Sequence, residues 1–308
     1  MSFRLAALSL FLRLVEKPRL ARANSPQRVR AAFERSAARA FRTPPDANVI
    51  DDRFEGPAGP IPVQWVSRGR PDRKAVVVYF HGGAYLAGSP ATHQHLCAVL
   101  AGHAGARVMA PAYRLAPETP WPGAVEDALA CYRALLASGY DADRIAFAGD
   151  SAGGGLAFAA LVAARAAGLP DPRCIAAFSP WLDLTLSQQS LARNARSDPL
   201  LPAASIEETR DHYVSAKDAG DPTASPLYAD LPNPPPVLIQ ASRIELLADE
   251  AEMMAQNLRE AGGEVRLEWF AKAPHAWHLF AGYAPEADDA LRRAGAFLRA
   301  RISRDPPD

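Results

Sequence analysis

The most constraining feature of the 308-residue chain is a serine between glycines, at the point where a strand pattern changes to a helical pattern. Residues 145–149 form an apolar, β-prone run, and the Ala-rich stretch 155–167 is helix-prone. Between them, Gly149-Asp150-Ser151-Ala152-Gly153 has the G-x-S-x-G pattern of a nucleophile elbow. Glycines allow so sharp a turn, and the turn strains the serine backbone. We therefore predict Ser151 as a nucleophile, with Asp150 directed elsewhere into supporting hydrogen bonds.

A second strand pattern, at 75–80, ends in His81-Gly82-Gly83-Ala84-Tyr85, which has the form of an oxyanion loop. Acyl transfer places negative charge on a carbonyl oxygen, and each backbone N–H aimed at it lowers the barrier by about 2.7–4 kcal/mol. Gly82 and Gly83 have no side chains to block that approach. Their N–H groups and that of Ala152 are the predicted donors. The pocket or its support is expected to include His81, Ala84, Tyr85 and Trp181. Alone, His-Gly-Gly would indicate only a tight turn.

A nucleophilic serine of this kind needs a histidine base, which follows the serine in the chain. His275 comes after an alternating strand pattern at 265–270 and a short loop, so it is expected at a strand's carboxyl end. Catalytic groups of open α/β sheets gather at such ends. His278 is interpreted as a hydrogen-bonded supporting residue, and His212 as part of a helical lid.

The acid is expected between the serine and the histidine. A strand pattern at 236–241 leads into a segment with three carboxylates, of which Glu245 comes first. Asp249 and Glu250 begin a helical run at 249–261, where acidic side chains favour the helix N-terminus for structural reasons. Glu245 is the predicted acid, and Asp249 remains open as the alternative.

These motifs resemble those of bacterial carboxylesterases of the hormone-sensitive-lipase-like family of α/β-hydrolases. The matching segments occur in family order within residues 60–300: 81–83, 113–118, 149–154, 179–181 and 274–275. Two departures stand out. Ala84 occupies the place of a third glycine, and Glu245-Leu-Leu-Ala-Asp249 replaces the common Asp-Pro-Leu-x-Asp motif. The second departure is similar to a subset of the family that uses glutamate.

The resemblance implies a serine hydrolase that cleaves short- to medium-chain carboxylic esters through an acyl-enzyme, without a cofactor. The expected partner is a small-molecule ester. A lactone, amide or thioester hydrolase with the same triad is the alternative. A non-catalytic receptor on this fold is a further alternative, but a receptor would not need His275.

Alternating strand and helix patterns predict an α/β fold with a mostly parallel, doubly wound sheet of eight strands. The expected strands are 48–55, 61–67, 75–80, 106–112, 145–149, 174–179, 236–242 and 265–270. The alternation lapses in an insertion at about 183–231, which has helical stretches at 186–195 and 203–216. So long an insertion is typical of a functional lid. We expect a catalytic domain at 46–308 and a cap formed by this insertion and residues 1–45.

Composition excludes some functions. Lys+Arg and Asp+Glu are both 34, so the basic excess of a nucleic-acid-binding protein is missing. The three cysteines have no metal-ligand spacing and indicate free thiols in a reducing cytoplasm. His93, His95 and His103 lack acidic partners in the sequence, so no metal is expected. A homodimer remains open.

The N-terminal run 5–12 is apolar but too short to span a bilayer, and charged residues follow it without a cleavage site. An amphipathic helix in the cap is expected. Its packing over the acyl pocket would use Leu5, Leu8, Phe11 and Leu12, together with Leu200 and Leu201. Attachment to a membrane surface through Phe3, Leu10 and Phe11 is the alternative; stable membrane insertion is not expected.

Overall fold

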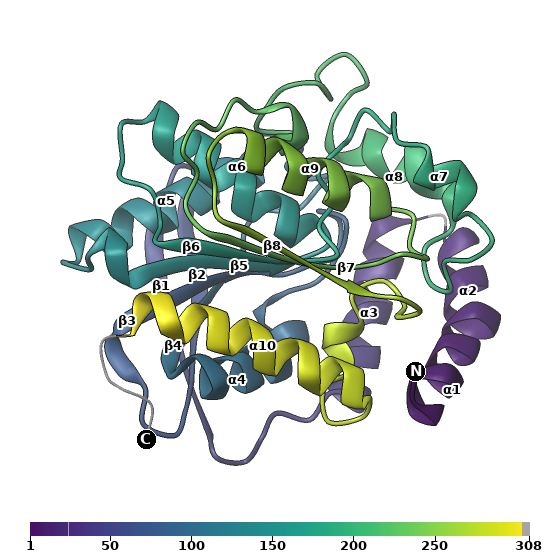
Figure 1. Cartoon of the computed structure of the whole chain (residues 1–308), viewed down its shortest axis with the longest axis horizontal. Coiled ribbons are helices and arrows are strands. Elements are labelled where there is room, and N and C mark those ends of the chain that lie inside the picture. Colours follow the sequence, from purple (N-terminus) through teal and green to yellow (C-terminus); the bar gives the residue numbers. More distant parts are fainter. Residues whose placement is uncertain (24, 304–308) are drawn as a thin grey trace.

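The computed structural model describes residues 1–23 and 25–303, and an eight-stranded sheet crosses its centre (Figure 1). The strands are β1 (Ala47–Gly56), β2 (Gly59–Arg68), β3 (Asp72–Phe80), β4 (Ala106–Pro111), β5 (Ile145–Asp150), β6 (Cys174–Phe178), β7 (Val237–Ser242) and β8 (Val265–Phe270). Their order is β1-β2-β4-β3-β5-β6-β7-β8. The β1–β2 and β2–β4 pairs are antiparallel, and the remaining pairs are parallel. The predicted α/β fold with a mostly parallel sheet is confirmed.

The central strands form because their sequences are short apolar runs rich in β-branched and small residues. In β3, residues 75–80 are all buried, as is every residue of β5, β6 and β7. Such continuous burial is typical of parallel strands that are covered on both faces. The edge strand β1, by contrast, is largely exposed.

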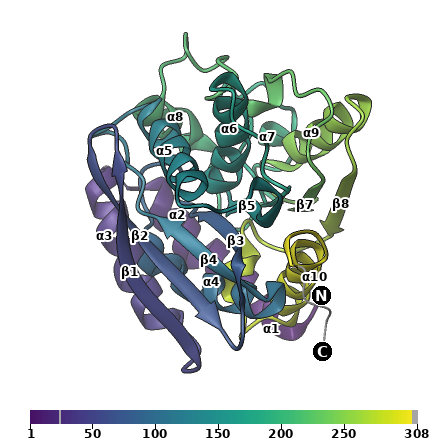
Figure 2. The ribbon, with the colours of Figure 1, turned by 90° about the vertical axis from the view of Figure 1, so that its left-hand side faces the viewer.

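Helices cover both faces of the sheet (Figure 2). On one face lie α5 (Gly123–Ala137), α6 (Ala152–Ala166) and α9 (Ala248–Glu260). On the other lie α4 (Pro90–Ala104) and α10 (Pro285–Ile302). Each helix follows a strand, so the loops at the carboxyl ends of β3, β5, β7 and β8 meet at one edge. Open α/β sheets hold their ligand sites at such an edge.

The insertion after β6 is less helical than its sequence predicts. It contains α7 (Ser190–Arg193), η3 (Ala203–Ser205), α8 (Ile206–Tyr213) and η4 (Pro226–Tyr228). The helix predicted at 186–195 is therefore reduced to one turn. The buried Asp183 carboxylate accepts the N–H groups of Thr185 (2.8 Å) and Ser187 (3.1 Å), which holds this stretch in a turn. Local side-chain bonds of this kind compete with helix formation.

The N-terminal segment forms α1 (Phe3–Phe11), the π-helical turn η1 (Leu12–Glu16), α2 (Lys17–Ala21) and α3 (Pro26–Ala40). Leu5, Leu8 and Leu12 are buried in the core cluster that contains α4 and α10. Phe11, expected to pack with them, is instead 50% exposed. Leu200 packs against the same cluster, whereas Leu201 packs against the cluster on the opposite face. None of the described helices is both long and apolar enough to cross a membrane.

Side chains of the N-terminal helices reach the insertion through its backbone. The Arg13 guanidinium donates to the carbonyl oxygens of Arg196 and Ser197. Lys17 Nζ donates to the carbonyl oxygens of Ala195 (2.8 Å) and Asp198 (2.7 Å). The two segments predicted as a cap are therefore in direct contact.

Candidate active site

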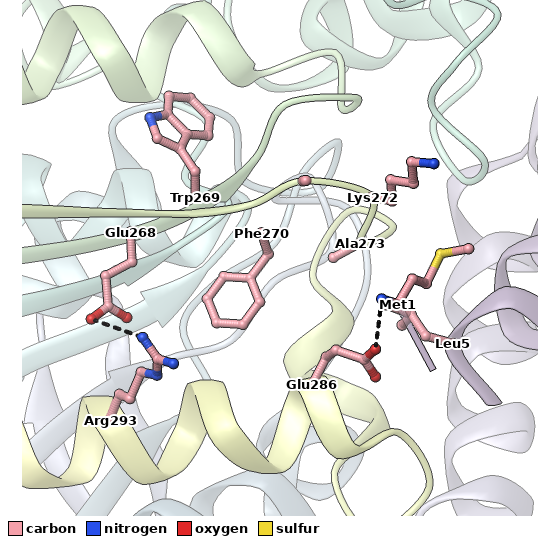
Figure 3. Close-up of a pocket in the computed structure, with 10 residues that line it drawn as sticks. Met1, Leu5, Glu268, Trp269, Phe270, Lys272, Ala273, Glu286 and Arg293 are labelled. Carbon is pink, nitrogen blue, oxygen red and sulfur yellow. Dashed lines mark ion pairs between the residues drawn. The ribbon is translucent and has the colours of Figure 1, made fainter. Parts of the chain in front are cut away.

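A cavity of about 590 Å³ opens between α1, the end of β8 and α10 (Figure 3). Four of its charged groups form two pairs: Glu268 lies 4.0 Å from Arg293, and Glu286 lies 4.0 Å from the Met1 ammonium. The lining residues are Met1, Leu5, Glu268, Trp269, Phe270, Ala271, Lys272, Ala273, Glu286 and Arg293. Ser151 is absent from this lining, so the nucleophile lies elsewhere.

Ser151 lies in the turn between β5 and α6 with φ 54° and ψ −124°. A positive φ is unfavourable for a non-glycine residue, so the surrounding structure must hold it. The flanking glycines make this possible. A Cβ at Gly149 would overlap the Gly153 carbonyl, and one at Gly153 would overlap the Phe80 carbonyl. The local geometry is that of the predicted nucleophile elbow.

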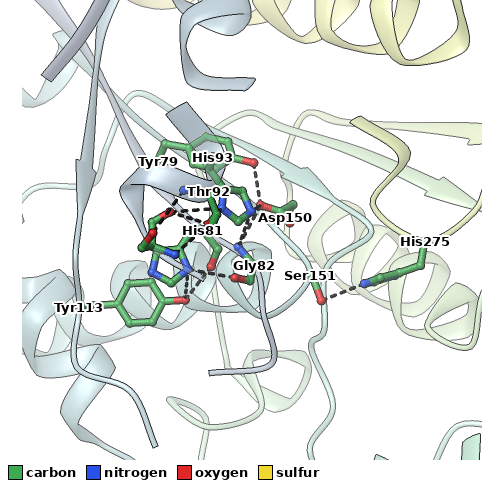
Figure 4. A network of polar contacts seen from close by, with 10 residues as sticks. Tyr79, His81, Gly82, Thr92, His93, Tyr113, Asp150, Ser151 and His275 are labelled. Carbon is green, nitrogen blue, oxygen red and sulfur yellow. Dashed lines mark hydrogen bonds and ion pairs between the residues drawn. The ribbon is translucent and has the colours of Figure 1, made fainter. Parts of the chain in front are cut away.

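Three strand ends bring Ser151, His275 and Glu245 together. Ser151 Oγ lies 2.9 Å from His275 Nε2, and His275 Nδ1 lies 2.8 Å from Glu245 Oε2 (Figure 4 shows the first pair). The carboxylate can only accept, so Nδ1–H donates to Glu245 and Nε2 accepts the Ser151 hydroxyl proton. This tautomer is the one a general base requires.

His275 and Glu245 lie in a buried, polar environment. Glu245 is fully buried, and its Oε1 accepts the Ser242 N–H at 2.7 Å. Asn194 from the insertion donates to the Glu245 carbonyl at 2.8 Å. Burial lowers the pKa of His275, but the hydrogen bond and charge of Glu245, with the charges of Asp198 and Asp150, outweigh burial and raise this pKa above its usual value.

Asp249, the alternative acid, does not reach His275. It lies in the first turn of α9, where it accepts the Ser190 N–H at 2.8 Å and pairs with Arg193. Its neighbour Glu250 is buried and accepts the N–H groups of Leu182 and Asp183. Both carboxylates therefore hold the insertion, as structural rather than chemical groups.

The oxyanion loop requires one correction. The Gly82 N–H, a predicted donor to substrate, donates instead to Asp150 Oδ1 at 3.0 Å. Gly82 lacks a side chain because the Asp150 carboxylate occupies the place a Cβ would take. The glycine therefore permits contact with Asp150 rather than with a substrate.

Other N–H groups of the loop remain free. Within residues 1–23 and 25–303, those of Gly83, Ala84 and Ala152 donate to no protein acceptor. Ala84 and Tyr85 both have left-handed backbone conformations, with φ 58° and φ 60°. Strained backbone of this kind persists only where the surrounding structure holds it, and it is typical of active sites.

A buried polar network surrounds Gly82 and Asp150 (Figure 4). Asp150 Oδ1 accepts the Tyr79 hydroxyl at 2.7 Å and lies 3.3 Å from His93 Nε2. Burial would raise the pKa of Asp150, but the charge and hydrogen bond of His93 and the Tyr79 hydrogen bond lower it to about 2. Nothing in the sequence indicated this role for His93. Only the fold brings α4 next to Asp150.

His81 stacks on Tyr113 at 4.2 Å between ring centroids, and burial lowers its pKa to about 3. It is therefore a neutral part of the loop's support. His278 Nε2–H donates to Gln240 Oε1 at 2.9 Å, in keeping with a supporting role, while His212 lies in α8.

Aromatic side chains surround the start of α6. The backbone N–H of Trp181 donates to the Ser151 carbonyl at 2.9 Å, which places this residue beside the nucleophile. Tyr85 and Tyr213 stack with centroids 3.8 Å apart and planes within 4°. Tyr213 comes from α8 of the insertion and was missed by the sequence analysis, since an aromatic residue in a lid helix carries no distinguishing pattern.

Comparisons with known proteins agree with this geometry. A family model described as the alpha/beta hydrolase fold matches residues 77–279. An acetyl-hydrolase of Streptomyces hygroscopicus is 42% identical over 236 residues, covering 77% of this chain and 79% of that protein. An ethyl acetate hydrolase of Pseudomonas putida is 36% identical over 225 residues, covering 70% of each. The crystal structure of an esterase from the bacterial hormone-sensitive lipase family gives a TM-score of 0.91 at 38% identity, covering 98% of this chain and 99% of that one.

The sheet, its helices and the family match define an α/β-hydrolase. Within that class, the chain belongs to the bacterial hormone-sensitive-lipase-like family and is a carboxylic ester hydrolase. The predicted family and enzyme class are confirmed.

Proposed function

We propose that this enzyme hydrolyses short-chain carboxylic esters, with Ser151 as nucleophile, His275 as base and Glu245 as the residue that orients His275. The observation that carries the proposal is the continuous pair of contacts Ser151–His275 (2.9 Å) and His275–Glu245 (2.8 Å). The three side chains come from loops after three different strands, so packing alone gives no reason for their alignment.

In the first half of the reaction, Ser151 Oγ attacks the acyl carbonyl carbon while its proton moves to His275 Nε2. The ionised Glu245 stabilises the imidazolium that forms. His275 then gives the proton to the alkoxide, and the alcohol leaves. The product is an acyl-Ser151 ester.

In the second half, His275 removes a proton from water, and the resulting nucleophile attacks the acyl-enzyme carbonyl. Ser151 leaves with the proton from His275, which releases the carboxylic acid. Both halves pass through a tetrahedral oxyanion. We assign its stabilisation to the N–H groups of Gly83, Ala84 and Ala152, which corrects the predicted set at one position, Ala84 for Gly82.

We infer that the Tyr85–Tyr213 stack and Trp181 limit the acyl chain near Ser151. The Tyr85 hydroxyl lies 3.3 Å from the place of a Cβ at Gly155, one turn into α6. Two relatives are named as an acetyl-hydrolase and an ethyl acetate hydrolase. The acyl group in both names has two carbons. The substrate class that fits best is therefore acetyl and other short acyl esters of small alcohols.

We further propose that residues 1–45 and 183–231 form a cap on the catalytic domain 46–308. The bonds from Arg13 and Lys17 to the backbone of 195–198 support this, as does the bond from Asn194 to Glu245. The free thiols Cys97, Cys131 and Cys174 are all buried, which suits a reducing cytoplasm.

The direct test is a turnover profile on nitrophenyl esters from two to sixteen acyl carbons, with a lactone and a matched nitroanilide. We expect the highest kcat/KM at two to six carbons and weak or absent amide cleavage. Ser151→Ala should lose activity by several powers of ten while keeping its fold. More than about a tenth of the wild-type turnover in Ser151→Ala would remove this residue from the mechanism.

A further inference from the structure

Exposed apolar side chains concentrate at one end of the chain. Ten large hydrophobic residues are exposed among the described positions, and six of them lie within the first fifteen residues. These six are Met1, Phe3, Leu10, Phe11, Leu14 and Val15, with exposed fractions from 46% to 87%. Single exposed apolar residues are ordinary, but a contiguous group marks an interaction surface.

The helical register divides this segment into two apolar faces. Phe3, Leu10 and Leu14 are spaced i, i+7 and i+11, so they lie along one side of α1 and its continuation; we call these three residues the outer stripe. Leu5, Leu8 and Leu12 lie on the opposite side and are buried. One face of the segment therefore packs into the core, and the second apolar face is exposed to solvent.

Polar contacts on the inner side hold this orientation. The Ser2 hydroxyl donates to Glu286 at 2.8 Å at one end of α1. Arg13 and Lys17 bind backbone carbonyls of 195–198 at the other end. Figure 1 shows α1 and α2 at the edge of the molecule, with open space beyond them. The outer stripe cannot turn inward without breaking these contacts.

Residues 1–42 also carry an excess of positive charge. Residues 1–42 contain ten Arg and Lys but only two Glu, whereas the whole chain is balanced at 34 of each sign. On α3, the exposed residues Arg28, Arg35 and Arg39 repeat the i, i+7, i+11 spacing. None of these three arginines forms an ion pair within the described part of the chain.

The exposed apolar residues and the positive charge indicate which kind of partner binds the outer stripe. An amphipathic helix with apolar residues on one face and basic residues in the same segment, here the exposed Arg4, Arg13 and Arg19, binds the interface of anionic bilayers. A second copy of this chain suits the surface poorly, because a symmetric contact would oppose two segments of equal positive charge. Nucleic acid would match the charge but leave the outer stripe in water.

We propose that the N-terminal segment docks peripherally on an anionic lipid surface, with Phe3, Leu10 and Leu14 entering the acyl-chain region. Exposed arginines of residues 1–42 contact the lipid phosphates. The segment lies in the interface and does not cross the bilayer.

The test is flotation of the full-length protein with vesicles of phosphatidylcholine alone or with 30% phosphatidylglycerol. We expect binding to the anionic vesicles, weak binding to the neutral ones, and loss of most binding at 0.5 M salt. Leu10→Ser/Leu14→Ser should weaken binding about tenfold or more, since it removes two inserting side chains. The matched control Ile50→Ser/Met253→Ser changes two exposed apolar residues elsewhere and should bind like wild type.

The readout does not depend on catalysis, so Ser151→Ala should float like wild type, and circular dichroism reports folding of each variant. Equal binding by the Leu10/Leu14 variant and its control would overturn the proposal. So would absence of wild-type binding to anionic vesicles. Sedimentation velocity that shows a dimer converted to monomer by Leu10→Ser/Leu14→Ser, without vesicle binding, would instead assign the surface to a second copy.

Discussion

The Asp150 carboxylate accepts the Gly82 N–H at 3.0 Å, and this bond ties the nucleophile elbow to the oxyanion loop. The residue before the nucleophile thereby holds the residue before the proposed oxyanion donors. The Tyr79 hydroxyl and His93 Nε2 contact the same oxygen, Asp150 Oδ1. The relative position of nucleophile and oxyanion donors is thus set by one buried ionised group.

Asp150→Asn should lower kcat by about ten- to a hundredfold with a smaller change in KM, because misplaced donors weaken binding of the transition state more than that of the substrate. The measurement is steady-state kinetics on nitrophenyl acetate. The matched control is Asp127→Asn, which alters a buried aspartate bonded to Arg114. In this variant neither kcat nor KM should change appreciably. A purely structural role for Asp150 would instead lower stability and leave the kinetics of the folded fraction normal.

The same carboxylate should influence acid stability. Its pKa in the folded protein is about 2, below the usual value, so the stability it contributes is present above about pH 4 and is lost as pH falls towards 2. Asp150→Asn should therefore show a smaller loss of unfolding free energy across this range. Urea denaturation at several pH values measures the difference, and parallel curves for the two proteins would contradict it.

Glu245→Gln should reduce turnover far more than Asp249→Asn, because only Glu245 contacts His275. We expect a loss of at least a hundredfold for the first and less than about threefold for the second. Both substitutions preserve shape, so they compare charge alone. A larger effect at Asp249 would reverse the assignment of the acid.

Turnover should fall on acidification through an apparent pKa above the usual histidine value of about 6.5. The base works as neutral imidazole, and the pKa of His275 is raised because Glu245 outweighs burial. In Glu245→Gln, burial acts unopposed by this partner, so the midpoint of the residual activity should move to lower pH. A flat wild-type profile between pH 5 and 8 would argue against a histidine base.

Tyr213→Leu should shift the preferred acyl length upward, because it removes the ring stacked on Tyr85. The expected change is a several-fold gain in kcat/KM for octanoate relative to acetate esters. Tyr283→Leu, at a tyrosine that is 47% exposed, is the control. An unchanged chain-length profile would show that the aromatic pair does not border the acyl group.

Much of the fold could be predicted because its local signals agree. Strands β3, β5 and β7 are short apolar runs that end in Gly- or Ser-containing turns, and every expected strand occurs in the sheet. Ser151, Glu245 and His275 were each predicted from a motif directly after a strand. Parallel strands gather such positions at one edge, so sequence order alone indicated that these residues meet.

The errors have a different origin. Which N–H of the loop stays free depends on Asp150, 68 positions away from Gly82, and no local pattern records that contact. The helix expected at 186–195 lost to side-chain bonds from Asp183. Phe11 continued an apolar pattern, but the helix buries the face that carries Leu5, Leu8 and Leu12 and leaves Phe11 exposed. The first case depends on a tertiary contact, and the second on local side-chain hydrogen bonds that compete with the helix.

The anchoring of the N-terminal helices on main-chain oxygens affects how this family can diversify. Arg13 and Lys17 bind carbonyl groups of residues 195–198, and every amino acid at these positions supplies the same acceptor. Mutations at 195, 196 and 197 can therefore accumulate without separating the two segments. Selection is free to alter the side chains of the insertion, and with them the preferred substrate, while the attachment persists unchanged.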